Sequence, residues 1–104
     1  MTNNLYTIIS QTNNEVQIKL SDKTHPIFKA HFPNNPILPG FLQIDIIAEI
    51  LKDEIKIINK SKFISHILPN DIITYEINIK NDNKKAIKII KNNKKISEFT
   101  YETN

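Results

Sequence analysis

A base, an oxyanion donor and an acid lie close together in this sequence. His31 opens a proline-rich segment, Gly40 closes it, and Asp45 follows five residues later. A neutral imidazole can remove a proton, and a carboxylic acid can supply one. If a helix begins at Gly40, the N–H of this glycine lies where the helix dipole favours developing negative charge. These residues predict acid–base chemistry that passes through an oxyanion and requires no metal and no organic cofactor.

Two elements must position these residues. Residues 25–40 contain four prolines, and each removes a backbone donor and restrains the residue before it, so an irregular and well-defined loop is expected here. Residues 40–52 are apolar on almost every side of a helical wheel, and their narrow polar stripe consists of Asp45, Glu49 and Lys52. A helix that is apolar on most sides is buried, so the rest of the chain has to wrap around it.

The other segments alternate apolar and polar residues with the period of half-buried strands. Asparagine-rich turns separate the strands, at residues 13–14, 81–83 and 92–93. Strands before and after one buried helix predict an α+β fold in which a curved antiparallel sheet wraps around that helix. The chain, residues 1–104, is long enough for a single domain. Because so small a domain buries only about two-thirds of its unfolded surface, an oligomer is also expected.

Composition excludes several classes of function. Without cysteine there is no disulfide framework and no thiolate for catalysis or zinc binding. All 14 basic side chains are lysines, and a net charge of +3 without an aromatic–basic platform does not indicate a nucleic-acid surface. The N-terminus does not read as a signal peptide, and no apolar stretch approaches the roughly 18 residues of a membrane span. A cytoplasmic protein is therefore expected.

The segment from His31 to Gly40, HFPNNPILPG, resembles the β-hydroxyacyl-acyl-carrier-protein dehydratases of fatty-acid synthesis. That family has histidine followed by Phe-Pro, two more prolines three residues apart, and then glycine. Its helix carries an acidic residue five positions after the glycine, which is Asp45 here. The resemblance covers residues 27–79 and includes Lys62-Phe63 and the turn at residues 68–71. The residues around Asp45 are also similar to a smaller branch of stand-alone dehydratases that work on polyene-type chains.

The family's fold is a hotdog, and its members form dimers whose active sites lie at the subunit interface. The resemblance implies that His31 of one chain meets Asp45 of the other. It also implies that the Gly40 N–H contacts the thioester carbonyl and that the Ile37 carbonyl orients the His31 ring. The residues expected to contact the substrate are Phe32, Ile37, Pro39, Phe41 and Glu49.

The implied reaction is the dehydration of a 3-hydroxyacyl thioester to a trans-2-enoyl thioester, in fatty-acid or polyene-type chain synthesis. His31 would remove a proton from C2, the Gly40 N–H would stabilise the enolate-like oxygen, and Asp45 would assist departure of the 3-hydroxyl. The expected partner is an acyl carrier protein that carries the 3-hydroxyacyl chain. The expected assembly is a homodimer or a higher assembly of dimers, with no nucleic acid.

Other interpretations remain open at this point. Periodicity alone favours Asp45 and Glu49 as solvent-face charges, with Glu49 paired to Lys52. A hotdog thioesterase would use Asp45 to activate water or attack the thioester, whereas a non-catalytic acyl-binding module would need no catalytic residue. His25 and His66 are expected to be surface or capping residues.

The chain also departs from the family pattern. The family usually has glutamine where this chain has Glu49, and the family's Pro-Gly-Asp turn is Pro-Asn-Asp here. Glu49 lies one helical turn from Asp45, and the two carboxyl groups are expected to interact. No function is assigned to the tyrosines.

Overall fold

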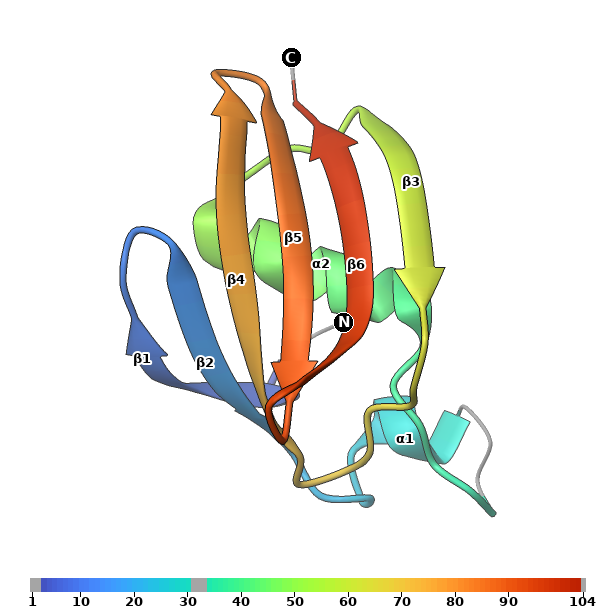
Figure 1. Ribbon diagram of the computed structural model, residues 1–104. Helices are drawn as coiled ribbons and strands as arrows, with labels where there is room; N and C mark the ends of the chain where they lie inside the picture. The colour runs from blue at the N-terminus through green and yellow to red at the C-terminus, as the bar shows by residue number, and fades with distance from the viewer. Residues whose placement is uncertain (1–2, 31–33, 104) are drawn as a thin grey trace.

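One antiparallel sheet wraps around one long helix. A computed structural model describes residues 3–30 and 34–103. The six strands lie in the order β1-β2-β4-β5-β6-β3, and the curved sheet passes over α2 (Figure 1). Chain order is β1 (Tyr6–Gln11), β2 (Glu15–Leu20), α1 (Pro26–Ala30), α2 (Gly40–Leu51), β3 (Ile57–Phe63), β4 (Ile72–Asn81), β5 (Lys84–Lys91) and β6 (Lys94–Glu102). The predicted α+β hotdog architecture is confirmed.

The core lies between the concave face of the sheet and α2. Alternate residues of the four central strands point to this face and are buried, as the period of a half-exposed sheet requires. They include Val16, Ile18, Ile73, Tyr75, Ile87, Ile89, Phe99 and Tyr101. From α2 they meet Leu42, Ile46 and Ile47, which are fully buried. The sequence pattern therefore predicted the correct face of each central strand.

Asparagine forms the tight turn between β5 and β6. Asn92 and Asn93 both have positive φ, of 53° and 65°, and they are the only two residues between the strands. A two-residue hairpin of this kind needs two left-handed residues, which asparagine tolerates better than most residues do. The predicted hairpin is confirmed.

The predicted irregular loop over residues 25–40 is wrong at its start, where α1 forms. Pro26 is the first residue of α1, a position at which its missing N–H costs nothing and its fixed φ suits a helix. His25 Nδ1 accepts a hydrogen bond from the Ile27 N–H at 3.0 Å, and His25 Nε2 lies 2.7 Å from the Asn3 carbonyl oxygen. His25 thus caps the start of α1, which is one of the two roles expected for it from the sequence.

Gln43 attaches α2 to the sheet and to the loop before it. Its side chain is only 3% exposed. The Ser97 hydroxyl donates to Gln43 Oε1 at 2.8 Å, and Gln43 Nε2 donates to the Leu38 carbonyl at 3.3 Å. The Tyr75 hydroxyl also donates to the Gln43 backbone carbonyl at 2.7 Å. A buried polar side chain needs such partners, and here they determine where the helix sits.

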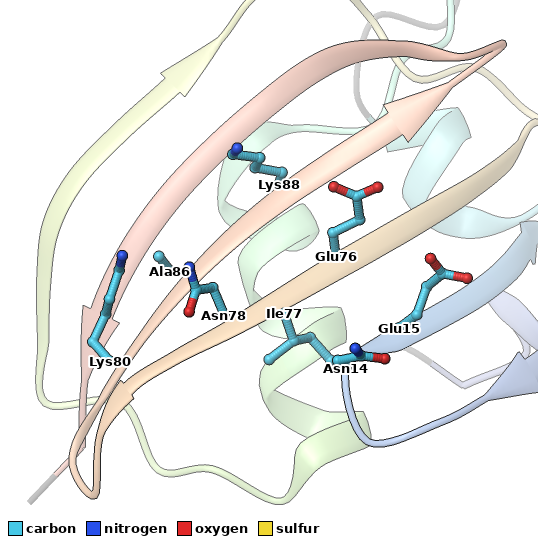
Figure 2. A pocket seen from close by; sticks show the side chains of 8 residues that line it. All are labelled: Asn14, Glu15, Glu76, Ile77, Asn78, Lys80, Ala86 and Lys88. Carbon is cyan, nitrogen blue, oxygen red and sulfur yellow. The ribbon is translucent and has the colours of Figure 1, made fainter.

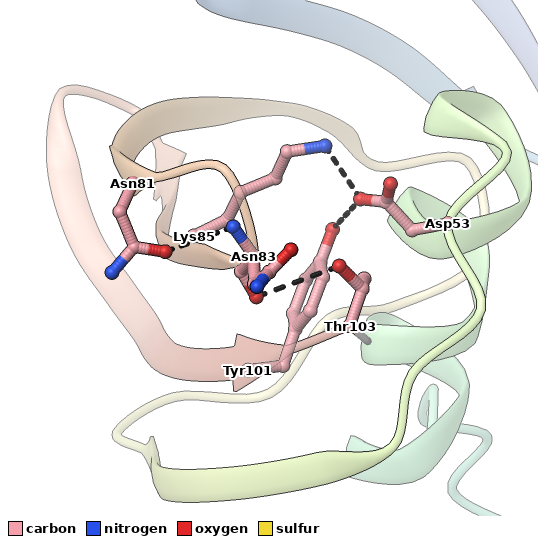
Figure 3. A network of polar contacts seen from close by, with 6 residues as sticks. All are labelled: Asp53, Asn81, Asn83, Lys85, Tyr101 and Thr103. Atoms are coloured by element: carbon pink, nitrogen blue, oxygen red, sulfur yellow. Dashed lines mark hydrogen bonds and ion pairs between the residues drawn. The ribbon is translucent and has the colours of Figure 1, made fainter.

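A second polar anchor holds the segment after α2. Lys85 Nζ and the Tyr101 hydroxyl both donate to Asp53 Oδ2, at 2.7 and 2.6 Å (Figure 3). Asp53 follows directly on Lys52, which ends the helix in a left-handed conformation with φ of 59°. Since Lys85 lies on β5 and Tyr101 on β6, the contact joins the C-terminal end of α2 to two central strands.

The edge strand β3 is exposed along its whole length. It pairs with β6 on one side only, and its residues Ile57, Ile58 and Phe63, together with Ile64 directly after it, are each 43–53% exposed. An edge strand presents unpaired backbone groups, and here it also presents apolar side chains. Such an edge is typical of a surface covered by another chain.

Candidate active site

Asp45 lies on an exposed line along α2. Phe41, Asp45 and Glu49 are spaced four residues apart and are exposed, whereas residues 42–44 and 46–48 are buried. Phe41 is 53% exposed, which is unusual for a large aromatic residue at the start of a central helix. The helix is therefore buried on most sides, as predicted, and its open side carries the predicted acid.

The segment before Gly40 contains the predicted base and several residues expected to contact the substrate. His31 and Phe32 lie outside the described residues. The loop that follows is described from Asn34 onward, and Ile37 and Pro39 are partly buried within it. Both peptide groups that flank Leu38 are tied down, because the Leu38 N–H donates to the Ile67 carbonyl at 2.8 Å and Gln43 donates to the Leu38 carbonyl. Two hydrogen bonds therefore anchor the segment that leads into Gly40.

Gly40 begins α2 beneath an aromatic ring. A Cβ atom at this position would lie 2.7–3.0 Å from three ring atoms of Phe63, closer than real Cβ contacts allow. Phe63 is the last residue of β3, so a side chain on Gly40 would collide with the end of the edge strand. The two separate segments of the sequence resemblance, the one ending at Gly40 and the one containing Phe63, are in contact in the structure.

The turn at residues 68–71 explains one departure from the family pattern. Asn70 has a φ of 67°, a left-handed conformation that favours glycine and that asparagine also tolerates. Asp71 Oδ2 accepts a hydrogen bond from the Leu68 N–H at 2.7 Å and forms an ion pair with Lys91 at 2.6 Å. Asparagine therefore keeps the turn that the family makes with glycine.

Glu49 has a partner that the sequence did not indicate. The Tyr6 hydroxyl, from the start of β1, donates to Glu49 Oε1 at 2.6 Å. Burial raises the pKa of Tyr6 well above its usual value, and the hydrogen bond and charge of Glu49 raise it further, so this phenol stays protonated. Asp45 and Glu49 share one exposed line of α2, and Tyr6 contacts this line at Glu49.

Sequence reasoning missed Gln43 and Tyr6. Gln43 is the one polar residue on the buried side of α2, and a lone polar residue on an apolar face requires buried partners, so a signal for its anchoring role was present. Tyr6 gave no such signal, because an aromatic residue that begins a β-prone segment is most simply a packing residue. Its contact depends on where β1 lies relative to α2.

Other features of the described residues do not contribute to this site. A hollow of about 460 Å³ lies on the face of the sheet opposite α2, where Glu15, Glu76 and Lys88 project from neighbouring strands (Figure 2). It contains none of the predicted site residues. Within residues 3–30 and 34–103, no three His, Cys, Asp or Glu side chains group to hold a metal ion. In the same part of the chain, no helix is long and apolar enough to cross a membrane.

Comparison with known proteins identifies the family. The model of the ApeI-like dehydratases, described as ApeI dehydratase, matches residues 8–100. This chain belongs to the ApeI-like dehydratase family. Over 65 residues it is also 37% identical to the 3-hydroxyacyl-[acyl-carrier-protein] dehydratase FabZ of Clostridium novyi (strain NT), covering 50% of this chain and 46% of that protein. For the FabZ of Ehrlichia canis (strain Jake), identity is 30% over 90 residues, covering 69% of this chain and 61% of that protein.

The first of these relatives are longer than the aligned region, and the chain spans about half their length. Among solved structures, the ApeI:P dehydratase heterocomplex from Xenorhabdus doucetiae superimposes with a TM-score of 0.77 at 22% identity, covering 93% of this chain and 96% of that one. Thioesterase superfamily member 2 from Mus musculus gives a TM-score of 0.62 at 13% identity, covering 95% and 80%. These likenesses confirm the fold. The resemblance to the dehydratases is confirmed by the family match.

Proposed function

We propose that this chain dehydrates a 3-hydroxyacyl thioester, delivered by an acyl carrier protein, to a trans-2-enoyl thioester in fatty-acid or polyene-type chain synthesis. The observation that carries the proposal is the placement of two predicted site residues on α2, within a family of dehydratases. Gly40 begins the helix, and Asp45 stands on its exposed line. A cytoplasmic location remains a prediction from the sequence.

In the proposed reaction, neutral His31 removes the C2 proton of the substrate. The thioester oxygen gains negative charge and is stabilised by the Gly40 N–H at the start of α2, an effect worth roughly 2.7–4 kcal/mol in comparable oxyanion sites. The C2 electrons then form the C2–C3 double bond as the C3–O bond breaks. Asp45 gives its proton to the departing hydroxyl, which leaves as water. Acid–base assistance of this kind contributes on the order of 10²–10⁴-fold to the rate.

The site we propose is shared between two chains, with His31 and Gly40 from one and Asp45 from the other. Two observations support it. The line formed by Phe41, Asp45 and Glu49 is open on the outside of α2, and the edge strand β3 carries exposed apolar side chains. Exposed apolar surface of this extent favours a chain that is covered by another, and a homodimer is the simplest such assembly.

Mixing two inactive variants tests both the residues and the sharing. His31→Ala and Asp45→Asn are each expected to abolish enoyl thioester formation while keeping wild-type thermal stability. When the two are mixed and allowed to exchange subunits, half of the dimers are mixed, and one site of each mixed dimer has both native residues. Activity is then expected to return to about a quarter of the wild-type value.

Mass-spectrometric loss of water from 3-hydroxyacyl thioesters measures the activity, with each variant alone as the control. Failure of the mixture to regain activity, with subunit exchange verified, would show that the site is not shared. A hotdog thioesterase would instead release free thiol, which a parallel thiol assay detects. A variant of His31 that keeps its activity would remove this residue from the mechanism.

A further inference from the structure

A hydrogen bond between Tyr6 and Glu49 joins α2 to β1, the edge strand opposite β3. Glu49 lies one helical turn beyond Asp45. Tyr6 is partly buried beside β2, where it is the Cα partner of Leu20, so packing holds its ring. Its hydroxyl donates to Glu49 Oε1 at 2.6 Å. Because Tyr6 stays protonated, this hydrogen bond persists over the neutral pH range. The contact therefore keeps one oxygen of the Glu49 carboxylate in a fixed place.

A hollow of about 370 Å³ opens beside this contact. The described residues that line it are Asn3, Asn4, Tyr6, Ile8 and Glu49. Two amides, a phenol and a carboxylate make most of this lining polar. An apolar chain placed here would take water from the carboxylate without replacing its hydrogen bonds, which is unfavourable. The hollow therefore suits a polar part of a ligand.

We propose that the Tyr6–Glu49 pair is a specificity determinant that binds a hydrogen-bond donor, an N–H or O–H group, on the substrate. This inference rests on the proposed function. Tyr6 uses its donor on Glu49, and a carboxylate accepts hydrogen bonds but has none to donate. The glutamine usual at this position in the dehydratases that the sequence resembles could both donate and accept. The pair in this chain is thus restricted to donors on the ligand.

Helix geometry indicates where that donor lies. Asp45 and Glu49 are four residues apart, which is about 6 Å along a helix axis. An extended chain covers about 3.3–3.6 Å in three bonds, so the donor atom stands about five or six bonds from the carbon that bears the 3-hydroxyl. Two parts of a substrate satisfy this distance. One is the first amide N–H of the pantetheine arm, and the other is a hydroxyl near the end of a medium-length acyl chain.

Binding of unreactive saturated thioesters, measured by calorimetry, separates these two sources. The first pair of ligands is the octanoyl thioester of N-acetylcysteamine and its 2-acetoxyethyl counterpart, in which an ester oxygen replaces the amide N–H. The second pair is the 8-hydroxyoctanoyl and nonanoyl thioesters of N-acetylcysteamine, in which a methyl group replaces the hydroxyl. The donor-bearing member of one pair is expected to bind about tenfold to a hundredfold more tightly, as one hydrogen bond to a charged group allows.

Variants show whether the pair is responsible. Glu49→Leu is expected to bring the preference to about unity, and Tyr6→Phe to reduce it severalfold, because Glu49 then loses its fixed place. Glu49→Gln keeps an acceptor and is expected to keep part of the preference. Ile8→Ala is the matched control, since it lines the same hollow without a polar group and should weaken both ligands of a pair equally. Urea unfolding verifies that each variant is folded.

Equal affinity within both pairs, no binding of any thioester, or a preference that survives Glu49→Leu would each overturn the inference. Turnover of 3-hydroxyacyl thioesters is measured separately. Selective binding without dehydration would contradict the proposed function and support the role of Tyr6 and Glu49 in binding. Dehydration without selective binding would support the proposed function and contradict that role.

Discussion

Gln43 offers a sharp test of how the core positions the site. Its side chain accepts from the Ser97 hydroxyl and donates to the Leu38 carbonyl, so it joins α2 both to β6 and to the loop that leads into Gly40. Gln43→Leu keeps nearly the same volume and removes both hydrogen bonds. Ser97 is 0% exposed and Leu38 is 2% exposed, so neither the Ser97 hydroxyl nor the Leu38 carbonyl can form a replacement hydrogen bond with water.

The expected loss of stability follows from that burial. A buried polar group left without its partner costs about 1–3 kcal/mol, and two are created, so Gln43→Leu is expected to lower the free energy of unfolding by about 2–6 kcal/mol. This is a large part of the roughly 5–15 kcal/mol available to a small domain. Ser97→Ala alone orphans only Gln43 Oε1 and is expected to cost about 1–2 kcal/mol. In the double variant the orphaned hydroxyl is gone, so Ser97→Ala should cost almost nothing there.

Urea unfolding followed by circular dichroism, at one protein concentration, measures all four proteins of this cycle. The coupling between Gln43 and Ser97 is expected to be about 1 kcal/mol or more. Additive losses, with a coupling below about 0.3–0.5 kcal/mol, would refute the view that the two side chains act as one buried unit. Turnover should fall with Gln43→Leu even where the protein is fully folded, because the loop before Gly40 loses one of its two ties.

Two further predictions concern neighbouring parts of the molecule. Asp53→Ala removes the acceptor shared by Lys85 and Tyr101 and should cost about 2–3 kcal/mol in urea unfolding, with Tyr101→Phe costing less. Burial, with the hydrogen bond to Asp53, raises the pKa of Tyr101 above the 10.0 of a free tyrosine. The stability that Tyr101 contributes is therefore present below pH 10 and is lost as the pH rises further. If the free energy of unfolding falls above pH 10 to the same extent in Tyr101→Phe, this explanation is contradicted. Gly40→Ala should displace the exposed Phe63 ring and lower turnover, with a change in the free energy of unfolding within about 1 kcal/mol. Adding Phe63→Leu to the same chain should restore part of the rate. An unchanged rate in Gly40→Ala would show that the close approach of Gly40 and Phe63 is irrelevant to catalysis.

The periodicity of apolar residues predicted the fold correctly where a residue's structure depends only on its neighbours in sequence. The alternation in β4 identifies Ile73 and Tyr75 as core residues, and Asn92-Asn93 identifies a hairpin, because side-chain direction and turn conformation are local properties. The same reasoning failed for α1. Four prolines over residues 25–40 indicated a loop, but Pro26 begins a helix, because proline's missing N–H costs nothing at the first helical position.

The site residues were predictable only where the sequence motif identified them. Gly40 and Asp45 fall on α2 as expected, yet periodicity alone would have made Asp45 an ordinary surface charge. The contact between Tyr6 and Glu49 spans 43 positions of sequence, so it depends on the packing of β1 beside the helix and not on any local pattern. His31 lies outside the described residues, and its role stays a prediction.

The exposure of Asp45 has a physical consequence for the proposed reaction. An acid–base site gains most of its strength when water is excluded and the surrounding dipoles are fixed. The described residues of one chain bury the side of α2 that faces the sheet and leave the line from Phe41 to Glu49 open. The chain also exposes apolar side chains on β3, whose last residue, Phe63, contacts the position of Gly40. A second chain seated along that edge would cover the apolar strand and exclude water beside Gly40 at the same time. The stability of the assembly and the chemistry of the proposed site would then depend on the same surface.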